Sequence, residues 1–411
     1  MRILWLSDFY PPYIGGLERH VQMVAGELAA REHQVSVATI WHEAAPGFEL
    51  DNGVKVYRLK GLTQRAPYLS SDAKRGFHPT APDPFIIKGL LKIIDGESPQ
   101  IVIASGWILY SYLPIKARSN ARLLVRHHDY AFICPKRTLF IKDSVCAGPG
   151  LVKCYPCTAD HYGLIKGTAI TTSFRFFSQF HGLVDRHLPI SHFVAEAIGL
   201  SGRLPPDSVH VVPAPVPDAI FEYKPCDTPP SELPQGGDYI LFVGALTRAK
   251  GLEVLLDAYR GLENRAKLVL IGTDWPESPS RYPEGVIVIK NAPHGFVMEA
   301  FNHCLFSVVP SLWAEPFGQV AVEAMAASKP VVASARGGLT DIVIDQETGI
   351  LVAPGDAALL HDAMLKLIDD ANLRRRLGSE GYLRAKRQFT CTQVTNQIEM
   401  VCKDVLSGST N

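Results

Sequence analysis

The sequence predicts an α/β fold in which two doubly wound parallel sheets follow one another along the chain. Apolar runs of strand length alternate with amphipathic helical patterns over residues 1–220, and again over residues 238–388. Strands separated by helices need crossover connections, which place helices on both faces of a parallel sheet. Between the two series, residues 221–237 are rich in Pro, Gly, Ser and acidic residues and lack periodicity. We therefore predict two Rossmann-like domains that are joined by this linker and face each other across a cleft.

Length and composition favour a compact protein of about two domains. The 411 residues exceed what one hydrophobic core normally organises. Hydrophobic residues make up 47% and charged residues 20%, which is typical of a folded α/β protein rather than a disordered or fibrous one. Lys plus Arg and Asp plus Glu both number 41, so the net charge of zero gives no support to nucleic-acid binding.

Hydropathy along the chain indicates the subcellular location of the protein. The first apolar run, which ends at Asp8, is too short for a secretory signal, and no later run approaches the roughly 18 apolar residues of a membrane span. We expect a cytoplasmic protein, with peripheral contact at the inner membrane surface as an alternative. The aromatic run Ser173–Phe180 could make that contact, although such a stripe more often lies in the core. The last residues, 389–411, are predicted to form a helix that can pack back on the first domain.

Two glutamates eight positions apart mark the most informative segment. Glu315 is followed by Pro316, and proline suits the first position of a helix. The run from Phe317 has the composition of a buried helix. Glu315 is thus predicted at the helix mouth and Glu323 about two turns inside. Carboxylates accept paired hydrogen bonds from vicinal hydroxyls, and the free N–H groups of Phe317, Gly318 and Gln319 would attract sugar or phosphate oxygens. The segment therefore indicates a site for a sugar nucleotide.

Three glycine-containing turns follow predicted strands and open predicted helices. Paired glycines let the backbone approach a ligand closely, and a helix N-terminus favours anionic groups. Each turn alone is equally compatible with a tight structural turn, but three at equivalent strand ends favour an anion site. The residues concerned are Gly15 and Gly16, then Gly244, and then Gly337, Gly338, Leu339 and Thr340.

Two cations follow the second of these turns. Arg248 and Lys250 stand beside Gly244 and precede Gly251. Cations at a glycine-rich turn are suited to neutralise a diphosphate leaving group. The alternative is a solvated loop, because basic residues are common on protein surfaces.

Taken in order, these motifs resemble the retaining glycosyltransferases of family 4, which have the two-domain GT-B fold. The shared patterns are PPxxGG, FVGxLxxxKG, LxxIG, PSxxxEPFGxxxxEAMAxxxPVVAS, the GG turn and TGxLVxPGD. They span nearly the whole chain, and the ordered set is specific for the family but not for any one substrate. The resemblance implies transfer of a hexose from a nucleotide-diphosphate sugar, with retention at the anomeric carbon and no further cofactor.

The resemblance also implies roles on the donor side. Glu315 and the amides that follow it would hold the hexose hydroxyls, and Glu323 would bind the nucleotide ribose. Arg248 and Lys250 would neutralise the diphosphate, aided by the turn that begins at Gly337.

On the other side, Gly15 and Gly16 would face the phosphates and the acceptor. His128 corresponds to the histidine that the family places near the reacting carbon, whereas its neighbour His127 is expected to point away, because adjacent residues diverge. No enzyme nucleophile is firmly identified in this family. The leaving phosphate itself is often taken to help deprotonate the acceptor, so catalysis rests on positioning and charge.

Four of the eight cysteines, within segment 130–160, leave two readings open. They are Cys134, Cys146, Cys154 and Cys157. Four thiols, two of them in a terminal C-x2-C, could supply the four ligands of a tetrahedral zinc ion, but the spacings are not those of a standard zinc finger. Free thiols in an acceptor-side loop are the other reading.

The leading hypothesis is an enzyme acting on a lipid-linked sugar, a polysaccharide or another glycan. A glycosidase fits poorly, because the two glutamates stand beside phosphate-binding turns and resemble hydroxyl ligands. An epimerase is disfavoured by the paired glutamates, and a starch or glycogen-type synthase by the short first loop. A non-catalytic sugar-nucleotide-binding protein is disfavoured because both glutamates and His128 are present. The donor base, the sugar and the acceptor stay open.

Overall fold

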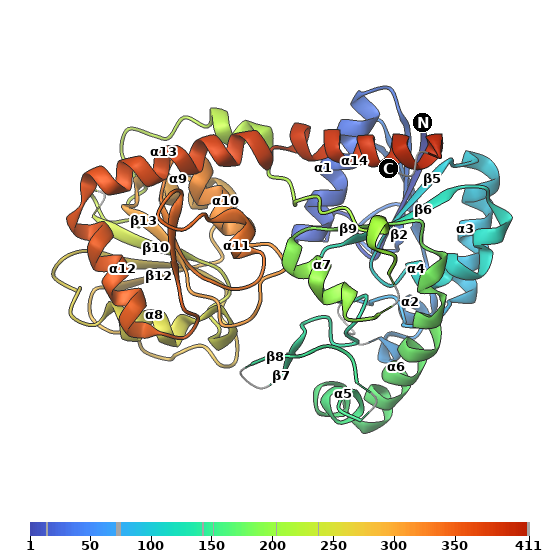
Figure 1. Cartoon of the computed structure of the whole chain (residues 1–411), viewed down its shortest axis with the longest axis horizontal. Coiled ribbons are helices and arrows are strands. Elements are labelled where there is room, and N and C mark those ends of the chain that lie inside the picture. Colours follow the sequence, from blue (N-terminus) through green and yellow to red (C-terminus); the bar gives the residue numbers. More distant parts are fainter. Residues whose placement is uncertain are drawn as a thin grey trace. The chain divides into compact units, whose positions relative to one another are not determined.

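The computed structural model describes residues 1–13, 15–70, 75–141, 144–150, 152–202, 204–236 and 238–408. The chain divides into two compact units, each with its own parallel sheet and its own helices (Figure 1). The first unit comprises Met1–Ile141, Cys146–Pro215 and Cys391–Asn411, and the second comprises Val216–Thr390 with Lys142–Val145.

The first sheet has seven strands in the order β3-β4-β2-β1-β5-β6-β9. Neighbouring strands are parallel except for the β3–β4 pair. All of β5, and all of β1 after its first residue, is buried, as expected for strands covered by helices on both faces. The strands are β1 (Arg2–Ser7), β2 (Gln34–Ile40), β3 (Phe48–Asp51), β4 (Val54–Leu59), β5 (Ile101–Ser105), β6 (Arg122–His127) and β9 (Arg186–Pro189).

Helices α1 and α14 lie on one side of this sheet and α3 on the other (Figure 1). Helix α3 begins at Pro84 because proline suits the first helical position and the Asp83 side chain accepts the N–H groups of Phe85 and Ile86. The helices of the first unit are α1 (Gly16–Ala30), α2 (Leu62–Arg65), α3 (Pro84–Glu97), α4 (Leu109–Tyr112), α5 (Cys154–Tyr162), α6 (Leu164–Phe177), α7 (His192–Gly199) and α14 (Cys391–Ser407), and β7 (Phe140–Ile141) and β8 (Ser144–Val145) are two-residue strands outside the large sheets.

The C-terminal helix α14 completes the core of the first unit. Its apolar side chains, among them Val394, Ile398 and Val401, join the cluster formed by α1 and the sheet. The edge of this contact is charged, since Arg31 pairs with Glu399 at 3.0 Å. In the aromatic run Ser173–Phe180, Phe174 is buried, whereas Phe176 and Phe180 are exposed. That run is therefore divided between core and surface.

The second sheet has six parallel strands in the order β12-β11-β10-β13-β14-β15. The strands are β10 (Tyr239–Val243), β11 (Lys267–Gly272), β12 (Val286–Lys290), β13 (Phe306–Val309), β14 (Val331–Ser334) and β15 (Gly349–Val352). The helices are α8 (Leu252–Tyr259), α9 (His294–His303), α10 (Gln319–Ala326), α11 (Leu339–Ile342), α12 (Ala357–Asp369) and α13 (Ala371–Gln388).

The segment predicted as a linker belongs to the second unit in this structure. The hydroxyl of Tyr223 donates to Glu299 on α9 at 2.5 Å, and the backbone N–H of Cys226 donates to the same carboxylate at 3.2 Å. These bonds attach the start of the Pro-rich stretch to α9. In the described part of the chain, no helix is both long and apolar enough to cross a membrane.

Candidate functional site

The strand order of the first unit brings three chain segments to one edge. Strands β1, β5 and β6 are neighbours, so their carboxyl ends lie side by side. The residues that follow them are Asp8, Gly106 and His128. Because the chain crosses to opposite sides of β1 through β2 and β5, this edge is a topological switch point, where open α/β sheets bind ligands.

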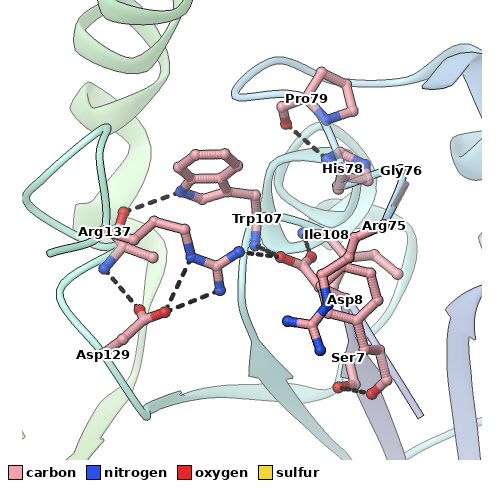
Figure 2. Close-up of polar contacts among 12 residues, drawn as sticks. Ser7, Asp8, Arg75, Gly76, His78, Pro79, Trp107, Ile108, Asp129 and Arg137 are labelled. Atoms are coloured by element: carbon pink, nitrogen blue, oxygen red, sulfur yellow. Dashed lines mark hydrogen bonds and ion pairs between the residues drawn. The ribbon is translucent and has the colours of Figure 1, made fainter. Parts of the chain in front are cut away.

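Asp8 organises this edge from a fully buried position. Its carboxylate accepts the backbone N–H of Trp107 at 3.0 Å and that of Ile108 at 2.7 Å (Figure 2). Burial raises the pKa of Asp8 above its ordinary value, although Arg137 opposes this shift. A side chain at Gly106 would place its Cβ 2.4 Å from the carboxylate, which explains glycine at that position.

Arg137 links two carboxylates across the same pocket. Its guanidinium lies 2.9 Å from Asp129 and 3.5 Å from Asp8, and Figure 2 shows it between them. It also lies over the rings of Phe77 and Trp107, at 4.6 and 5.2 Å from the ring centroids. The backbone of Arg137 is left-handed, with φ 68°. A paired and stacked guanidinium of this kind is held in a fixed position.

His128 lies in a polar pocket that also contains the first glycine pair. Its Nε2 is 3.2 Å from the Ser105 hydroxyl, and its ring meets that of His20 edge to face at 4.4 Å. Burial lowers the pKa of His128 well below its ordinary value, so the imidazole is neutral at pH 7. Gly15 and Gly16 line the same cavity of about 440 Å³. The structure thus brings together Gly15, Gly16 and His128, the residues predicted to face the donor phosphates, the reacting carbon and the acceptor.

His127 points to a different environment from His128. Its ring stacks on His187, with Nε2 3.0 Å from Nδ1 of that residue, and meets Phe132 edge to face. Phe132 in turn stacks on His181. The result is a buried group of three histidines: His127, His181 and His187.

This group predicts acid sensitivity. Burial lowers the pKa of His187 to about 4 and lowers that of His127 as well, whereas an unfolded histidine titrates near 6.5. Since the unfolded state binds more protons below pH 6.5, His187 alone should cost about 2 kcal/mol of unfolding free energy between pH 7 and 5. Urea unfolding at pH 7, 6 and 5 measures this. His187→Phe should flatten the pH dependence, and an unchanged slope in that variant would contradict the assignment.

In the second unit, the corresponding edge holds an ion pair. Strands β10 and β13 are neighbours, and the loops that follow them meet where the N–H groups of Leu312 and Trp313 donate to the Ala249 carbonyl. Gly251 makes the meeting possible, because a Cβ there would lie 1.8 Å from the Pro310 carbonyl oxygen. Glu315, from the β13 loop, is thereby brought to the β10 loop.

Glu315 accepts two short hydrogen bonds within this edge. Lys250 Nζ and the Ser311 hydroxyl both lie 2.6 Å from its Oε1. Burial alone would raise the pKa of Glu315, but the Lys250 ammonium and these hydrogen bonds outweigh it and leave the pKa below its ordinary value. The carboxylate is ionised and largely buried, while Lys250 is partly exposed. The pair therefore presents a fixed charge arrangement at a strand end.

The helix after Glu315 begins later than predicted. Helix α10 starts at Gln319, because Gly318 has a left-handed φ of 115° that interrupts the helix before it. The prediction of a helix from Pro316 was therefore wrong, and Glu315 lies in the loop after β13. Glu323 is the fifth residue of α10, about one turn inside rather than two.

The turn at Gly337 and Gly338 supports the backbone around Glu315. The N–H of Gly338 donates to the Glu315 carbonyl at 2.7 Å. A Cβ at Gly337 would lie 2.5 Å from that carbonyl oxygen, and one at Gly338 would lie 2.6 Å from Cα of Phe317. Leu339 is buried and the Thr340 hydroxyl donates to the Gly337 carbonyl, so side chains after the turn fix its shape.

The remaining predicted residues lie near this edge with other partners. Glu323 is buried and lies 3.2 Å from Nε2 of His294, which is partly exposed. Arg248 is exposed and lies 3.6 Å from Glu253. Gly244 has φ 153°, and its N–H donates to the Ile271 carbonyl at the end of the neighbouring strand β11.

The four clustered cysteines border one small pocket in the first unit. All are free thiols. Within the described ranges, no group of three or more His, Cys, Asp or Glu side chains is placed to hold a metal ion, so the structure gives the zinc hypothesis no support. Burial raises the pKa of the Cys134 thiol, which favours its protonated form.

Sequence reasoning missed Asp8, Arg137 and the Ser105 hydroxyl. Asp8 and Ser105 could have been found, because each stands at the end of an apolar strand run. Arg137 carries no such signal, since its position depends on a loop conformation after β6.

Two family models match the chain. Residues 14–219 match Glycosyltransferase Family 4, and residues 226–384 match Glycosyl transferases group 1. An uncharacterized glycosyltransferase from Methanocaldococcus jannaschii is 38% identical over 156 residues, covering 35% of this chain and 43% of that protein. The MMP alpha-(1->4)-mannosyltransferase from Mycolicibacterium hassiacum is 26% identical over 443 residues, covering 99% of each. The match thus spans less than half the length of the first of these relatives.

The fold is shared with solved structures. That of Anabaena HepE in complex with UDP-glucose superimposes with a TM-score of 0.64 and 18% identity, covering 98% of this chain and 99% of that one. The predicted GT-B class, with two Rossmann-like parallel sheets, is confirmed by this likeness and by the seven- and six-stranded sheets. With family models that match both halves in order, the chain belongs to glycosyltransferase family 4.

Proposed function

We propose that this protein is a retaining glycosyltransferase that moves a hexose from a nucleotide-diphosphate sugar to a lipid-linked sugar, a polysaccharide or another glycan. The observation that carries the proposal is the Lys250–Glu315 pair at adjoining strand ends of the second unit. It joins a cation suited to phosphate and a carboxylate suited to hydroxyls within 2.6 Å. Such a pair can hold a donor that carries both phosphates and sugar hydroxyls.

On the donor side, Lys250 and Arg248 neutralise the diphosphate as it leaves. Glu315 accepts hydrogen bonds from the hexose hydroxyls, and Glu323 accepts those of the ribose. The backbone N–H groups of Phe317, Gly318 and Gln319 and the turn of Gly337, Gly338, Leu339 and Thr340 supply further donors. Gly244, which precedes Arg248 and Lys250 in the loop after β10, lets the backbone of that loop approach the donor.

On the acceptor side, His128 acts near the reacting carbon as a neutral imidazole. Its lowered pKa supports this role, because a neutral ring can accept as well as donate a hydrogen bond. Gly15 and Gly16 leave room for phosphate and acceptor oxygens. Positioning and charge stabilisation carry the catalysis, with the leaving phosphate as the base for the acceptor hydroxyl. No further cofactor takes part.

A thermal-shift screen with UDP-, GDP- and ADP-sugars tests the donor assignment. A donor at about 100 times its Kd should add about 2.7 kcal/mol of stability and raise Tm. UDP-glucose and GDP-mannose come first, because HepE was solved with UDP-glucose and the M. hassiacum relative is a mannosyltransferase. In the Glu323→Ala variant, any nucleotide sugar that raises Tm of the parent should produce a smaller rise in Tm. If no nucleotide sugar changed Tm, or if the variant responded like the parent, the proposal would fail.

A further inference from the structure

The first unit contains a second, larger cavity beside the His128 pocket. Its volume is about 510 Å³, within the range of roughly 300–1,000 Å³ that is usual for ligand pockets. The 3-10 turn Pro67–Leu69, residues 77–80, Trp107 and one face of α6 form its walls. On α6 the lining positions Ile165, Ala169 and Ser173 recur every four residues, so they form one stripe of the helix.

The cavity wall is chemically apolar. Its large side chains include Leu62, Leu69, Phe77, Trp107, Ile165 and Ile170. Several polar side chains of the wall bond to the protein: Lys166 Nζ donates to the Ser70 carbonyl at 2.6 Å, and Thr80 donates to the Ile170 carbonyl at 3.1 Å. Both ring nitrogens of His78 are likewise paired. A ligand in this cavity therefore meets hydrocarbon and few available polar groups.

Large apolar side chains also stand exposed at the border of the cavity. Ile165 is 88% exposed, Tyr68 75% and Leu69 51%. Leu164, the neighbour of Ile165, is 75% exposed. Groups of exposed apolar residues mark binding surfaces more often than single ones do. The cavity thus has an apolar entrance as well as apolar walls.

Two aromatic residues connect this cavity to the pocket of His128. Phe77 lines both the apolar cavity and the 440 Å³ cavity that contains Gly15 and His128. Trp107 lines the apolar cavity and a smaller pocket bordered by His128 and Asp129. The two rings lie 6.5 Å apart. The two spaces therefore adjoin each other at these rings, which is the placement that a ligand with its head in one space and its chain in the other requires.

The two spaces differ in charge. Arg75, Lys136 and Arg137 line the His128 cavity, against the carboxylates of Glu18 and Asp129. Arg75 pairs with Glu18, and Arg137 pairs with both Asp129 and Asp8, whereas Lys136 donates to the Phe140 carbonyl and keeps its positive charge for an anionic head group. Among the described residues that line the apolar cavity there is one lysine or arginine, Lys166, and its ammonium donates to the Ser70 carbonyl.

We propose that the acceptor is amphipathic, with an alkyl or isoprenoid chain in the apolar cavity and a phosphorylated sugar head beside His128. The proposal rests on the proposed function and names the acceptor class for it. Of the acceptors considered, a lipid-linked sugar phosphate has both parts, whereas a free polysaccharide would leave the apolar cavity unused.

A chain-length series tests the proposal with the full chain, in the absence of vesicles and donor. The probes are n-alkyl phosphates of four to ten carbons below their critical micelle concentrations, measured by calorimetry and by tryptophan fluorescence. Burying one methylene is worth about fourfold in affinity, so Kd should fall about fourfold per added carbon until the cavity is filled. A Kd that does not depend on chain length would overturn the proposal.

A pair of variants on α6 assigns the binding to this cavity. Ala169→Phe places a ring in the lining stripe and should weaken binding of the longest probe at least tenfold, while leaving the four-carbon probe within twofold. Thr168→Phe adds the same ring at an adjacent exposed position outside the cavity, and this variant should bind the probes like the parent. Equal affinity of the two variants for the longest probe would place the chain elsewhere. The thermal shift with nucleotide sugars is measured in parallel, so loss of the donor response is distinguishable from loss of chain binding.

Discussion

Glu315→Gln should lower kcat/KM for the nucleotide sugar by about 10²–10³, the usual loss when one preorganised electrostatic contact is removed from an active site. The amide keeps the size of the side chain and can still accept the Ser311 hydroxyl, but it removes the charge that fixes Lys250 at 2.6 Å. Because Lys250 is partly exposed, water can solvate its freed ammonium. We therefore expect most of the loss in activity rather than in folding.

A double-mutant cycle with Lys250→Met sharpens this test. If the pair acts as a unit, the double variant should lose less than the product of the two single losses. Initial rates of donor turnover and urea unfolding are measured for all four proteins. Glu284→Gln, at an exposed loop position of the same unit, serves as the control and should retain activity within twofold. Independent, multiplicative losses at the two positions would show that the ion pair has no joint role.

The parallel sheets were predictable because their signals are local. Apolar runs such as those ending at Ser7, Ser105 and Ser334 are long enough to be strands and are separated by helical periods. The strand-end rule then locates ligands without any contact information. By this reasoning, Lys250 and Glu315 could be assigned to one site although 65 positions separate them.

The details that depend on backbone conformation were not predictable. Gly318 ends the loop after β13 with a left-handed φ, so helix α10 begins at Gln319 and not at the predicted Pro316. Gly337 and Gly338 were expected to serve a ligand, but the structure also shows them packed on the backbone of Glu315 and Phe317. A glycine pattern predicts close approach without showing whether the partner is a ligand or another loop.

Long-range side-chain pairing was equally hidden. Asp8 and Arg137 meet because β1 and β6 both flank β5 and because the loop after β6 turns back over the pocket. Neither the spacing nor the composition of the sequence encodes that contact. The apolar cavity is a similar case, since its walls come from residues 62–70 and 77–80, Trp107 and α6, which are far apart in the chain.

The second large effect is expected from Arg126→Met, which should reduce the free energy of unfolding by about 3–5 kcal/mol. Arg126 lies in β6 with 1% of its surface exposed, and its guanidinium donates to the carbonyls of Leu188, Val212 and Pro213. Burial lowers its pKa to about 9, so it stays protonated at pH 7. Methionine fills a similar volume but leaves the three carbonyls without this donor, at about 1–3 kcal/mol for each that stays buried and unpaired.

Arg122→Met is the matched control on the same strand. The Arg122 side chain is 50% exposed and pairs with Asp185 at 3.2 Å, so its replacement should cost no more than about 1 kcal/mol. Urea unfolding of both variants at pH 7 gives the comparison. Because the carbonyls of Leu188, Val212 and Pro213 belong to β9 and the chain that follows it, Arg126 ties this part of the first unit to β6. Similar losses in the two variants would mean that the cost of burying the Arg126 guanidinium cancels the stability that its three hydrogen bonds contribute.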